Sequence, residues 1–210
     1  MADLVLLHTS ETHIARFDRL AARIAPKARL AHETRPEWLE RAQKHGITDD
    51  LKAAFTDFVQ VSRAPVLCTC STLGPLADAA GAMRIDRPMM QAAARFGAPV
   101  LMAYCLESTC APSMALLAEC LEQTGHRPHI RALEITEAWP AFESGDEAAF
   151  AERIATAIRT HLAAFRDTKA VVLAQASMSA ACPFLAQALS QPVLSSPEPA
   201  LRATLGLPAS

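Results

Sequence analysis

The sequence predicts an α/β protein with mostly parallel sheets, because short apolar segments alternate with amphipathic helical patterns along its 210 residues. Several apolar segments end in hydroxyl-bearing turns directly before a helical pattern, as at Cys70-Ser71-Thr72. The strand–helix alternation also starts again at Pro99. In open α/β sheets, the carboxyl ends of strands are where ligands bind. We therefore expect the functional residues to lie at these ends.

Seven segments have the length and apolar character of buried strands. The first is a continuous apolar run that ends at His8-Thr9-Ser10, whereas the second and fifth are diluted by charged residues. The expected strands are Leu4–Leu7, Ala28–Glu33, Ala64–Cys70, Val100–Tyr104, His129–Ile135, Ala170–Gln175 and Gln191–Leu194.

Between these strands, apolar residues recur at helical spacing. Thr9, Ser10 or Thr12 is expected to cap the first helix, Pro26 ends it, and Gly81 closes the fourth. Residues 105–110 and 140–145 are expected to be loops, and 83–88 an irregular extended piece. The expected helices are Ile14–Ile24, Pro36–Lys44, Asp49–Val59, Pro75–Ala80, Pro88–Phe96, Pro112–Gln123, Asp146–Phe165, Ala180–Leu189 and Pro197–Leu205.

Composition excludes several classes of protein. Hydrophobic residues make up 51% and charged residues 20%, which supplies a large core and argues against disorder. The formal net charge is −2 with no basic block, so nucleic acid is not an expected partner. No segment has the pattern of a signal peptide or of a membrane span. We therefore expect a soluble cytoplasmic protein.

The six cysteines are scattered through the chain, which favours reduced thiols over a disulfide scaffold. No C-x-x-C pair is present, so no metal site is expected. We expect Cys68 to lie within its strand and Cys70 at the strand exit. A disulfide between them would be strained.

Cys70 is the candidate reactive residue, because helix N-terminal amides just beyond it would lower the thiol pKa and hold an anion. The alternative is an inert buried thiol. His8 could likewise be a hydrogen-bonded residue at a strand exit, or could orient a substrate or donate a proton. Ser108 and Thr109 could cap a helix, bind an anion, or do both. Asp86 is expected to form a turn with Arg87 rather than to line a pocket.

Five ordered motifs resemble the aspartate/glutamate/hydantoin racemase superfamily, which also holds maleate isomerase and arylmalonate decarboxylase. The resemblance covers almost the whole chain. The motifs are Leu6-Leu7-His8-Thr9, Cys70-Ser71-Thr72, Arg84-Ile85-Asp86-Arg87-Pro88-Met89, Leu106-Glu107-Ser108-Thr109 and Val171-Val172-Leu173-Ala174-Gln175-Ala176-Ser177-Met178.

The resemblance implies two pseudo-symmetric lobes, each a mostly parallel sheet flanked by helices, with the active site between them. Lobe one would span residues 1–96 and take back 191–210, and lobe two would span 98–190. It also implies a cofactor-independent isomerase that acts on a small carboxylate or amino acid, and a homodimer is a further expectation from the family.

Racemases of this family use one cysteine from each lobe, on opposite faces of the substrate's α-carbon. Cys70 matches the first cysteine, but Gln175 stands where the second is expected. A glutamine amide can hydrogen-bond a carboxylate but has no usable proton-transfer pKa. Cys182 lies seven residues further on and is expected to be core. The substrate carboxylate would be bound by His8, Thr9, Ser71, Thr72, Ser108, Thr109, Gln175 and Ser177.

The function expected from this resemblance is a racemase-like isomerase with Cys70 as thiolate acid/base or nucleophile. The missing second cysteine leaves two alternatives open. One is a one-cysteine lyase or decarboxylase, whose chemistry takes place on a single face of the substrate. The other is a non-catalytic protein that binds a carboxylate.

Overall fold

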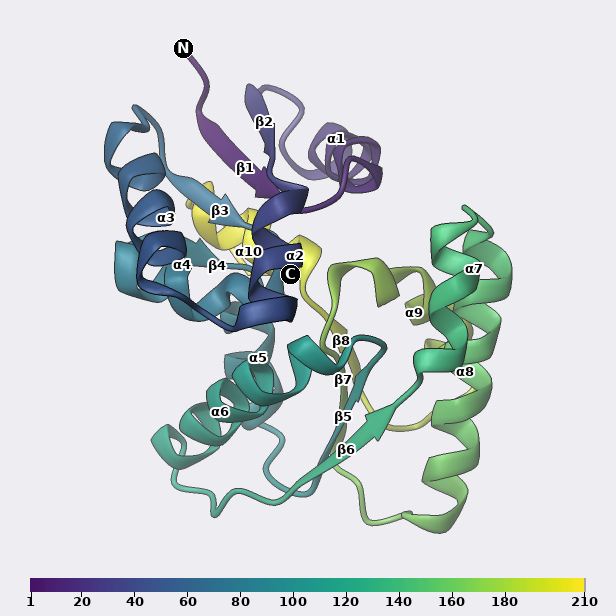
Figure 1. Ribbon diagram of the computed structural model, residues 1–210. Coiled ribbons are helices and arrows are strands. Elements are labelled where there is room, and N and C mark those ends of the chain that lie inside the picture. The colour runs from purple at the N-terminus through teal and green to yellow at the C-terminus, as the bar shows by residue number, and fades with distance from the viewer. Residues whose placement is uncertain (210) are drawn as a thin grey trace. The chain divides into compact units, whose positions relative to one another are not determined.

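The computed structural model describes residues 1–209, which divide into two compact units. Unit 1 comprises Met1–Arg87 and the segment from Pro197 onward, and unit 2 comprises Pro88–Ser196. Each unit contains one four-stranded sheet in which every neighbouring pair is parallel (Figure 1). The predicted two-lobe α/β fold class is confirmed.

The sheet of unit 1 has the strand order β2-β1-β3-β4. Its two central strands are apolar and buried, which explains why they show little alternation in the sequence. The elements of unit 1 are β1 (Leu4–His8), α1 (Thr12–Ile24), β2 (Leu30–Thr34), α2 (Pro36–His45), α3 (Asp49–Val61), β3 (Val66–Cys68), the 3₁₀ turn η1 (Ser71–Leu73), α4 (Gly74–Ala80), β4 (Met83–Arg84) and α10 (Pro197–Thr204).

The sheet of unit 2 has the equivalent order, β6-β5-β7-β8. Its elements are α5 (Arg87–Ala94), β5 (Val100–Tyr104), α6 (Glu107–Gln123), β6 (Ile130–Glu134), the 3₁₀ turn η2 (Thr136–Ala138), α7 (Trp139–Glu143), α8 (Glu147–Ala164), β7 (Ala170–Leu173), the 3₁₀ turn η3 (Ala176–Ala181), α9 (Cys182–Ala186) and β8 (Val193–Ser195). Arg87, the first residue of α5, is the last residue of unit 1 before the boundary.

Helices cover both faces of the unit 2 sheet. Leu101 and Ala103 of β5 belong to the core cluster that contains α8, whereas Val100 and Met102 belong to the cluster that contains α5 and α6. Figure 1 shows α5 and α6 on one side of β5 and α8 on the other. All five residues of β5 are buried as a result, so the strand appears in the sequence as a continuous apolar run.

The two compact units differ from the predicted lobes where the chain passes between them. We expected residues 88–96 and 191–196 in lobe one, whereas both segments belong to unit 2. Strand β8 pairs with β7, with Val171 opposite Val193, and the apolar side of α5 packs in the unit 2 core. The last strand of each sheet is therefore followed by a helix of the other unit: α5 follows β4, and α10 follows β8.

Three helix predictions and one loop prediction are also corrected. The N-cap of α1 is Glu11, with no side-chain cap bond, rather than one of the three predicted hydroxyl residues. Helix α6 begins at Glu107 rather than Pro112, so Pro112 lies inside the helix rather than at its first position. Residues 140–145, expected as a loop, lie largely in α7. The segment expected as a helix over Ala180–Leu189 is instead η3 followed by the short α9.

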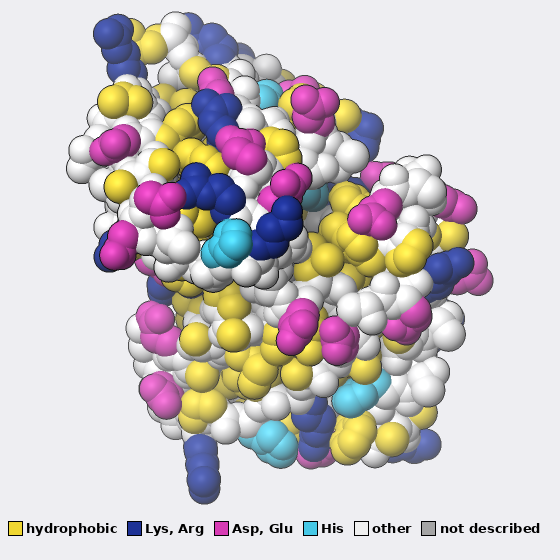
Figure 2. All heavy atoms as spheres, in the orientation of Figure 1, with side chains coloured by type: hydrophobic (Ala, Val, Ile, Leu, Met, Phe, Trp, Pro, Cys, Tyr) yellow, Lys and Arg dark blue, Asp and Glu magenta, His cyan; other side chains and the backbone are white. Residues whose placement is uncertain are grey.

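None of the helices in residues 1–209 is both long and apolar enough to cross a lipid bilayer. On the face shown in Figure 2, acidic, basic and apolar side chains are interspersed. This mixture agrees with the formal net charge of −2 for the whole chain.

Candidate functional site

In each unit, the strand order places one pair of strand ends at a topological switch point. From β1 the chain continues to β2 on one side, whereas β3 lies on the other side of β1. Ligands in open α/β sheets bind outside the carboxyl ends of such a pair. In unit 1 this position is occupied by Thr9, which follows β1, and by Cys70, two residues after β3.

Cys70 lies at the exit of β3, as predicted, and is the N-cap residue of η1. Cys68 is the last residue of the strand and is fully buried, and its thiol donates to the Cys70 carbonyl oxygen at 3.6 Å. Cys68 is therefore core, also as predicted, and its burial raises its pKa.

Four hydrogen-bond donors act on the Cys70 thiol. The side chains of Thr9 and Thr72 and the backbone amides of Thr72 and Leu73 each lower its pKa. We call these four groups the thiolate cradle. Donors of this kind stabilise the ionised form of the sulfur, because a thiolate accepts hydrogen bonds more strongly than a thiol.

Burial nevertheless outweighs the thiolate cradle. Cys70 is only 9% exposed, and this desolvation raises the pKa of its thiol, whereas the four donors act to lower it. We expected the start of the following helix to lower the Cys70 pKa, but the net effect of the surroundings is to raise it. The resting side chain is a neutral thiol that holds its proton next to groups able to stabilise the anion left behind.

A buried arginine supports the turn that carries the cradle. The Arg84 guanidinium lies directly against Gly74, the first residue of α4, where a Cβ atom would come within 2.8 Å of three guanidinium atoms. Glycine is required there because no side chain fits beneath the guanidinium. The cradle residues Thr72 and Leu73 immediately precede this glycine, so Arg84 limits where they can lie.

The guanidinium of Arg84 is itself held by two carboxylates. Asp86 accepts from Arg84 Nε at 2.8 Å and from Nη2 at 3.0 Å, and Asp78 accepts from Nη1 at 2.9 Å. The Asp86 side chain is fully buried. The sequence predicts that Asp86 forms a turn with Arg87; Ile85 and Asp86 do form a turn directly before Arg87, and the Arg87 side chain pairs with Asp78. The Arg-x-Asp spacing at a strand end was the available signal for the Arg84–Asp86 pair.

His8 ends β1, fully buried, with both ring nitrogens engaged. Its Nδ1 lies 2.8 Å from Thr69 Oγ1, and its Nε2 lies 2.9 Å from Nδ1 of His32. Burial is the first cause that lowers the pKa of His8 to about 3, so the ring is neutral near pH 7. His8 is thus placed to position its neighbours, and it has no ring nitrogen left for the substrate contact expected from the sequence.

Unit 2 carries the equivalent pair of strand ends, and Gln175 occupies the position equivalent to Cys70. Each follows its strand by two residues and is the N-cap of a 3₁₀ turn. The residue before each donates its amide to the neighbouring central strand at 2.9 Å, from Thr69 to Leu7 and from Ala174 to Ala103. The pseudo-symmetric repeat therefore reaches the level of single residues.

The side-chain amide of Gln175 is fixed by two backbone donors. Its Oε1 accepts from the amides of Cys105, at 2.6 Å, and Leu106, at 2.9 Å. Because backbone amides can only donate, the oxygen must face them and Nε2 must point the other way. Gln175 is 7% exposed. These two amides are occupied by Gln175, which leaves Nε2 as the group that can donate to a ligand.

The remaining predicted binding residues also lie at carboxyl ends of strands. Ser71 and Thr72 form η1 in unit 1. In unit 2, Ser108 and Thr109 lie in the first turn of α6, after β5, and Ser177 lies in η3, after β7. Since β5 and β7 are paired, these three hydroxyls belong to the same sheet edge as Gln175.

The other thiols of the protein are also free. Burial raises the pKa of Cys105 to about 12 and raises that of Cys182, whose thiol hydrogen-bonds the Ser195 side chain. Cys110 hydrogen-bonds Tyr104, and this bond raises the tyrosine pKa to about 12. Among the described residues, no cluster of three or more metal-ligating side chains is found.

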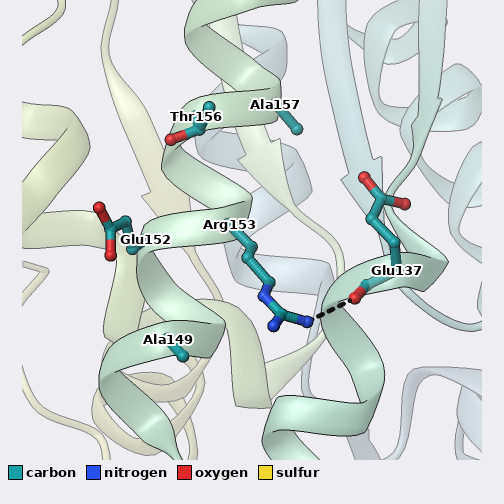
Figure 3. Close-up of a pocket in the computed structure, with 6 residues that line it drawn as sticks. All are labelled: Glu137, Ala149, Glu152, Arg153, Thr156 and Ala157. Carbon is teal, nitrogen blue, oxygen red and sulfur yellow. Dashed lines mark hydrogen bonds between the residues drawn. The ribbon is translucent and has the colours of Figure 1, made fainter.

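An open groove of about 520 Å³ lies elsewhere on unit 2, between η2 and the outer side of α8 (Figure 3). Arg153 reaches across it and donates to the carbonyl oxygen of Glu137 at 3.0 Å. The groove contains no thiol and none of the predicted site residues. We assign it no function. Its lining residues are Glu137, Ala149, Glu152, Arg153, Thr156 and Ala157.

No protein-family model matches the sequence, and no curated protein is similar to it in sequence. Solved structures are similar in fold. An aspartate racemase from Picrophilus torridus aligns with a TM-score of 0.65 at 12% identity, over 100% of this chain and 96% of its own. The chain has the fold of the aspartate/glutamate racemases.

Two further structures extend this similarity. An allantoin racemase from Klebsiella pneumoniae aligns with a TM-score of 0.60 at 17% identity, over 100% of this chain and 91% of its own. An arylmalonate decarboxylase aligns with a TM-score of 0.57 at 16% identity, over 97% of this chain and 92% of its own. The same fold is thus found in racemases and in a decarboxylase, so the residues of the site must decide the chemistry.

Proposed function

We propose that this protein is a racemase-like enzyme that moves a proton at the carbon next to a small carboxylate, with Cys70 as the acid/base. The observation that carries the proposal is the thiolate cradle at the switch point of the unit 1 sheet. Four donors that lower the pKa of a thiol favour its thiolate and do little for a thiol that stays neutral, because a neutral thiol is a weak acceptor.

Because its pKa is raised, Cys70 must first lose its proton to solvent; the thiolate then removes the substrate α-proton, and the thiol so formed returns a proton to the carbon. A neutral thiol can donate its proton to a carbanionic or enediolate carbon, and the thiolate that results is then stabilised by Thr9, Thr72 and the two amides. Removal of a substrate proton is the reverse of this step. The proposed reaction needs no cofactor, because the thiol itself supplies and accepts the proton.

Hydroxyls and amides at the strand ends would bind the substrate carboxylate. Each unit offers such donors at its own sheet edge: unit 1 has the Ser71 hydroxyl, and unit 2 has the Ser108 hydroxyl and the Nε2 donor of Gln175, whose direction is set by the two backbone amides. These donors stabilise the transition state more than the substrate, since the carboxylate gains negative charge as the neighbouring carbon loses its proton.

A one-cysteine lyase or decarboxylase is the second candidate, and Gln175 is the observation that favours it. A glutamine amide has no usable proton-transfer pKa near pH 7, so the position equivalent to Cys70 in unit 2 carries no acid/base. A single thiol suits a reaction in which a carboxylate leaves and Cys70 protonates the carbanion from one side.

The test is proton exchange in heavy water. The protein is incubated with a panel of small carboxylates, comprising single enantiomers of aspartate and glutamate and an aryl-substituted malonate. Proton NMR then follows loss of the α-proton signal and of the malonate. For racemase-like chemistry we expect α-deuteration that Cys70→Ser reduces by at least about 100-fold, the usual contribution of a general acid/base. Loss of malonate with deuterium incorporation would select the lyase.

Gln175→Glu separates catalysis from binding. The glutamate can still accept from both backbone amides but has no Nε2 donor, so substrate binding should weaken while the fold is kept. The proposal fails if no carboxylate of the panel exchanges or decarboxylates. If dicarboxylates nevertheless raise the melting temperature of the wild-type protein, the protein is a non-catalytic carboxylate binder.

A further inference from the structure

Gln175 fills a site that two consecutive backbone amides form in unit 2. Its Oε1 accepts from the amides of Cys105 and Leu106 at 2.6 Å and 2.9 Å. The oxygen of a glutamine amide and the oxygens of an ionised carboxylate are alike in that they only accept hydrogen bonds. Donors that hold the one can therefore hold the other, and Gln175 shows how this strand exit binds an oxygen atom.

The direction of the first amide follows from the strand order. The Tyr104 carbonyl belongs to the same peptide unit as the Cys105 amide, and it accepts from the amide of Ile135, which follows β6, at 2.8 Å. In a planar trans peptide the N–H points away from the carbonyl oxygen. Because β6 and β7 lie on opposite sides of β5, the Cys105 amide faces the exit of β7, where Gln175 lies.

The same reasoning places an equivalent amide in unit 1. The His8 carbonyl accepts from the amide of Arg35, which follows β2, also at 2.8 Å. The peptide between His8 and Thr9 is trans. Strands β2 and β3 lie on opposite sides of β1, so the Thr9 amide faces the exit of β3, where Cys70 lies.

The second amide of the pair has an equivalent too. In unit 2, the Leu106 carbonyl accepts from the Thr109 amide at 2.9 Å. In unit 1, the Ser10 carbonyl accepts from the His13 amide at 3.3 Å, over the same separation of three residues. The chain therefore turns in the same way after β5 and after β1. Ser10 corresponds to Leu106, and we call the amides of Thr9 and Ser10 the unit 1 amide pair.

The unit 1 amide pair donates to no protein acceptor within residues 1–209. Other groups of the two residues make their contacts: the Thr9 side chain acts on the Cys70 thiol, and the Ser10 hydroxyl bonds that of Thr12. Both residues are partly exposed to solvent. A cysteine side chain has no oxygen, so Cys70 cannot fill the pair as Gln175 fills its equivalent in unit 2.

We propose that the unit 1 amide pair binds one carboxylate oxygen of the substrate, in the way that unit 2 binds the Oε1 of Gln175. The Thr9 side chain acts on the Cys70 thiol, so a carboxylate on the Thr9 amide lies beside the sulfur. The catalytic part of this role rests on the proposed function. The carboxylate oxygen gains negative charge when the neighbouring carbon loses its proton, and two fixed amides stabilise that charge.

The proposal is tested by proton–nitrogen NMR of the backbone amides in the wild-type protein, titrated with acetate and then with malonate. A carboxylate that accepts from an amide moves the proton resonance of that amide downfield. The Thr9 and Ser10 resonances should move downfield and saturate together, whereas those of Cys105 and Leu106 should stay in place. Unmoved Thr9 and Ser10 resonances at the highest malonate concentration would overturn the proposal, whether or not malonate binds elsewhere.

Gln175→Ala tests the correspondence between the two units. The substitution removes the oxygen from the Cys105 and Leu106 amides, so acetate should now move these two resonances downfield as well. Gln175→Glu is the matched control, because a glutamate oxygen can still accept from both amides and should keep them unresponsive. Unresponsive unit 2 amides in a folded Gln175→Ala protein would overturn the proposed equivalence. If this variant does not fold, the wild-type titration decides alone.

These readouts do not require turnover. If no carboxylate reacts but the Thr9 and Ser10 amides respond, the proposed function fails and the carboxylate site stands. If turnover is found while both amides stay unmoved, the proposed function stands and the unit 1 amide pair is refuted as its carboxylate site.

Discussion

Replacing Thr9 by valine tests whether the thiolate cradle stabilises an anion at Cys70. Valine has nearly the shape of threonine but cannot donate a hydrogen bond, so the substitution removes one of the four donors to the sulfur. The thiol form loses little, because a neutral sulfur is a weak acceptor, whereas the thiolate loses a charge-assisted bond. The variant should fold normally and ionise less readily at Cys70.

The size of the effect follows from the hydrogen bond that is lost. A hydrogen bond to a charged group contributes about 1.5–3 kcal/mol, which corresponds to a thiolate population lower by about ten- to a hundredfold below the pKa. Thr9 is partly exposed, so the lower end of this range is expected. Alkylation by iodoacetamide at pH 7–9 measures it directly, since only the thiolate reacts.

Ser10→Ala is the matched control. The Ser10 hydroxyl hydrogen-bonds Thr12 at 2.8 Å and is not among the donors to the Cys70 sulfur. The alkylation rate of Cys70 in Ser10→Ala should equal that in the wild type. If Thr9→Val reacts as fast as Ser10→Ala at every pH, the Thr9 donor does not stabilise the thiolate, and this part of the argument for an acid/base role is wrong.

Two predictions concern stability. In Gly74→Ala, the new Cβ would lie 2.8 Å from the Arg84 guanidinium and displace it from the buried Asp86. Urea titration should then show a loss of up to about 3–5 kcal/mol in the free energy of unfolding. A variant as stable as the wild type would contradict the packing argument. The folded pKa of His8 is about 3, below the ordinary 6.5. Between these two pH values, the unfolded chain binds a proton at His8 that the folded protein does not. Stability from this group is complete above pH 6.5 and falls as the pH drops toward 3, by about 2–3 kcal/mol at pH 4.5. The free energy of unfolding, measured by urea titration, should therefore change less between pH 7 and pH 4.5 in His8→Asn than in the wild type. An equal change would refute the burial argument.

Much of the fold is visible in the sequence because burial dictates it. The apolar runs at Leu4–Leu7 and Val100–Tyr104 are central strands covered on both faces, and both were predicted within one residue. Helix α6 was started too late because Pro112 resembles a helix start, although it lies inside the helix. Strand β8 belongs to unit 2 because it pairs with β7, and local composition does not encode this pairing.

The candidate site was predictable in position but not in its interactions. Cys70 and Gln175 could be placed at strand exits from the apolar runs that precede them. The contacts of Gln175 Oε1 with Cys105 and Leu106 join residues about 70 positions apart and need the folded loops. The link from His8 to His32 likewise requires the parallel register of β1 with β2. The direction of the Cys70 pKa shift depends on burial, which no spacing reveals.

The crossing of α10 into unit 1 has a consequence for how the protein is made. Ala200 and Leu201 of α10 are fully buried, and the helix packs against α1, β3 and β4. On the ribosome, every residue of unit 2 is synthesised before α10 emerges. Unit 1 begins first but is completed last. The strand that leads to Cys70 therefore lacks the packing of α10 until the whole of unit 2 has been synthesised.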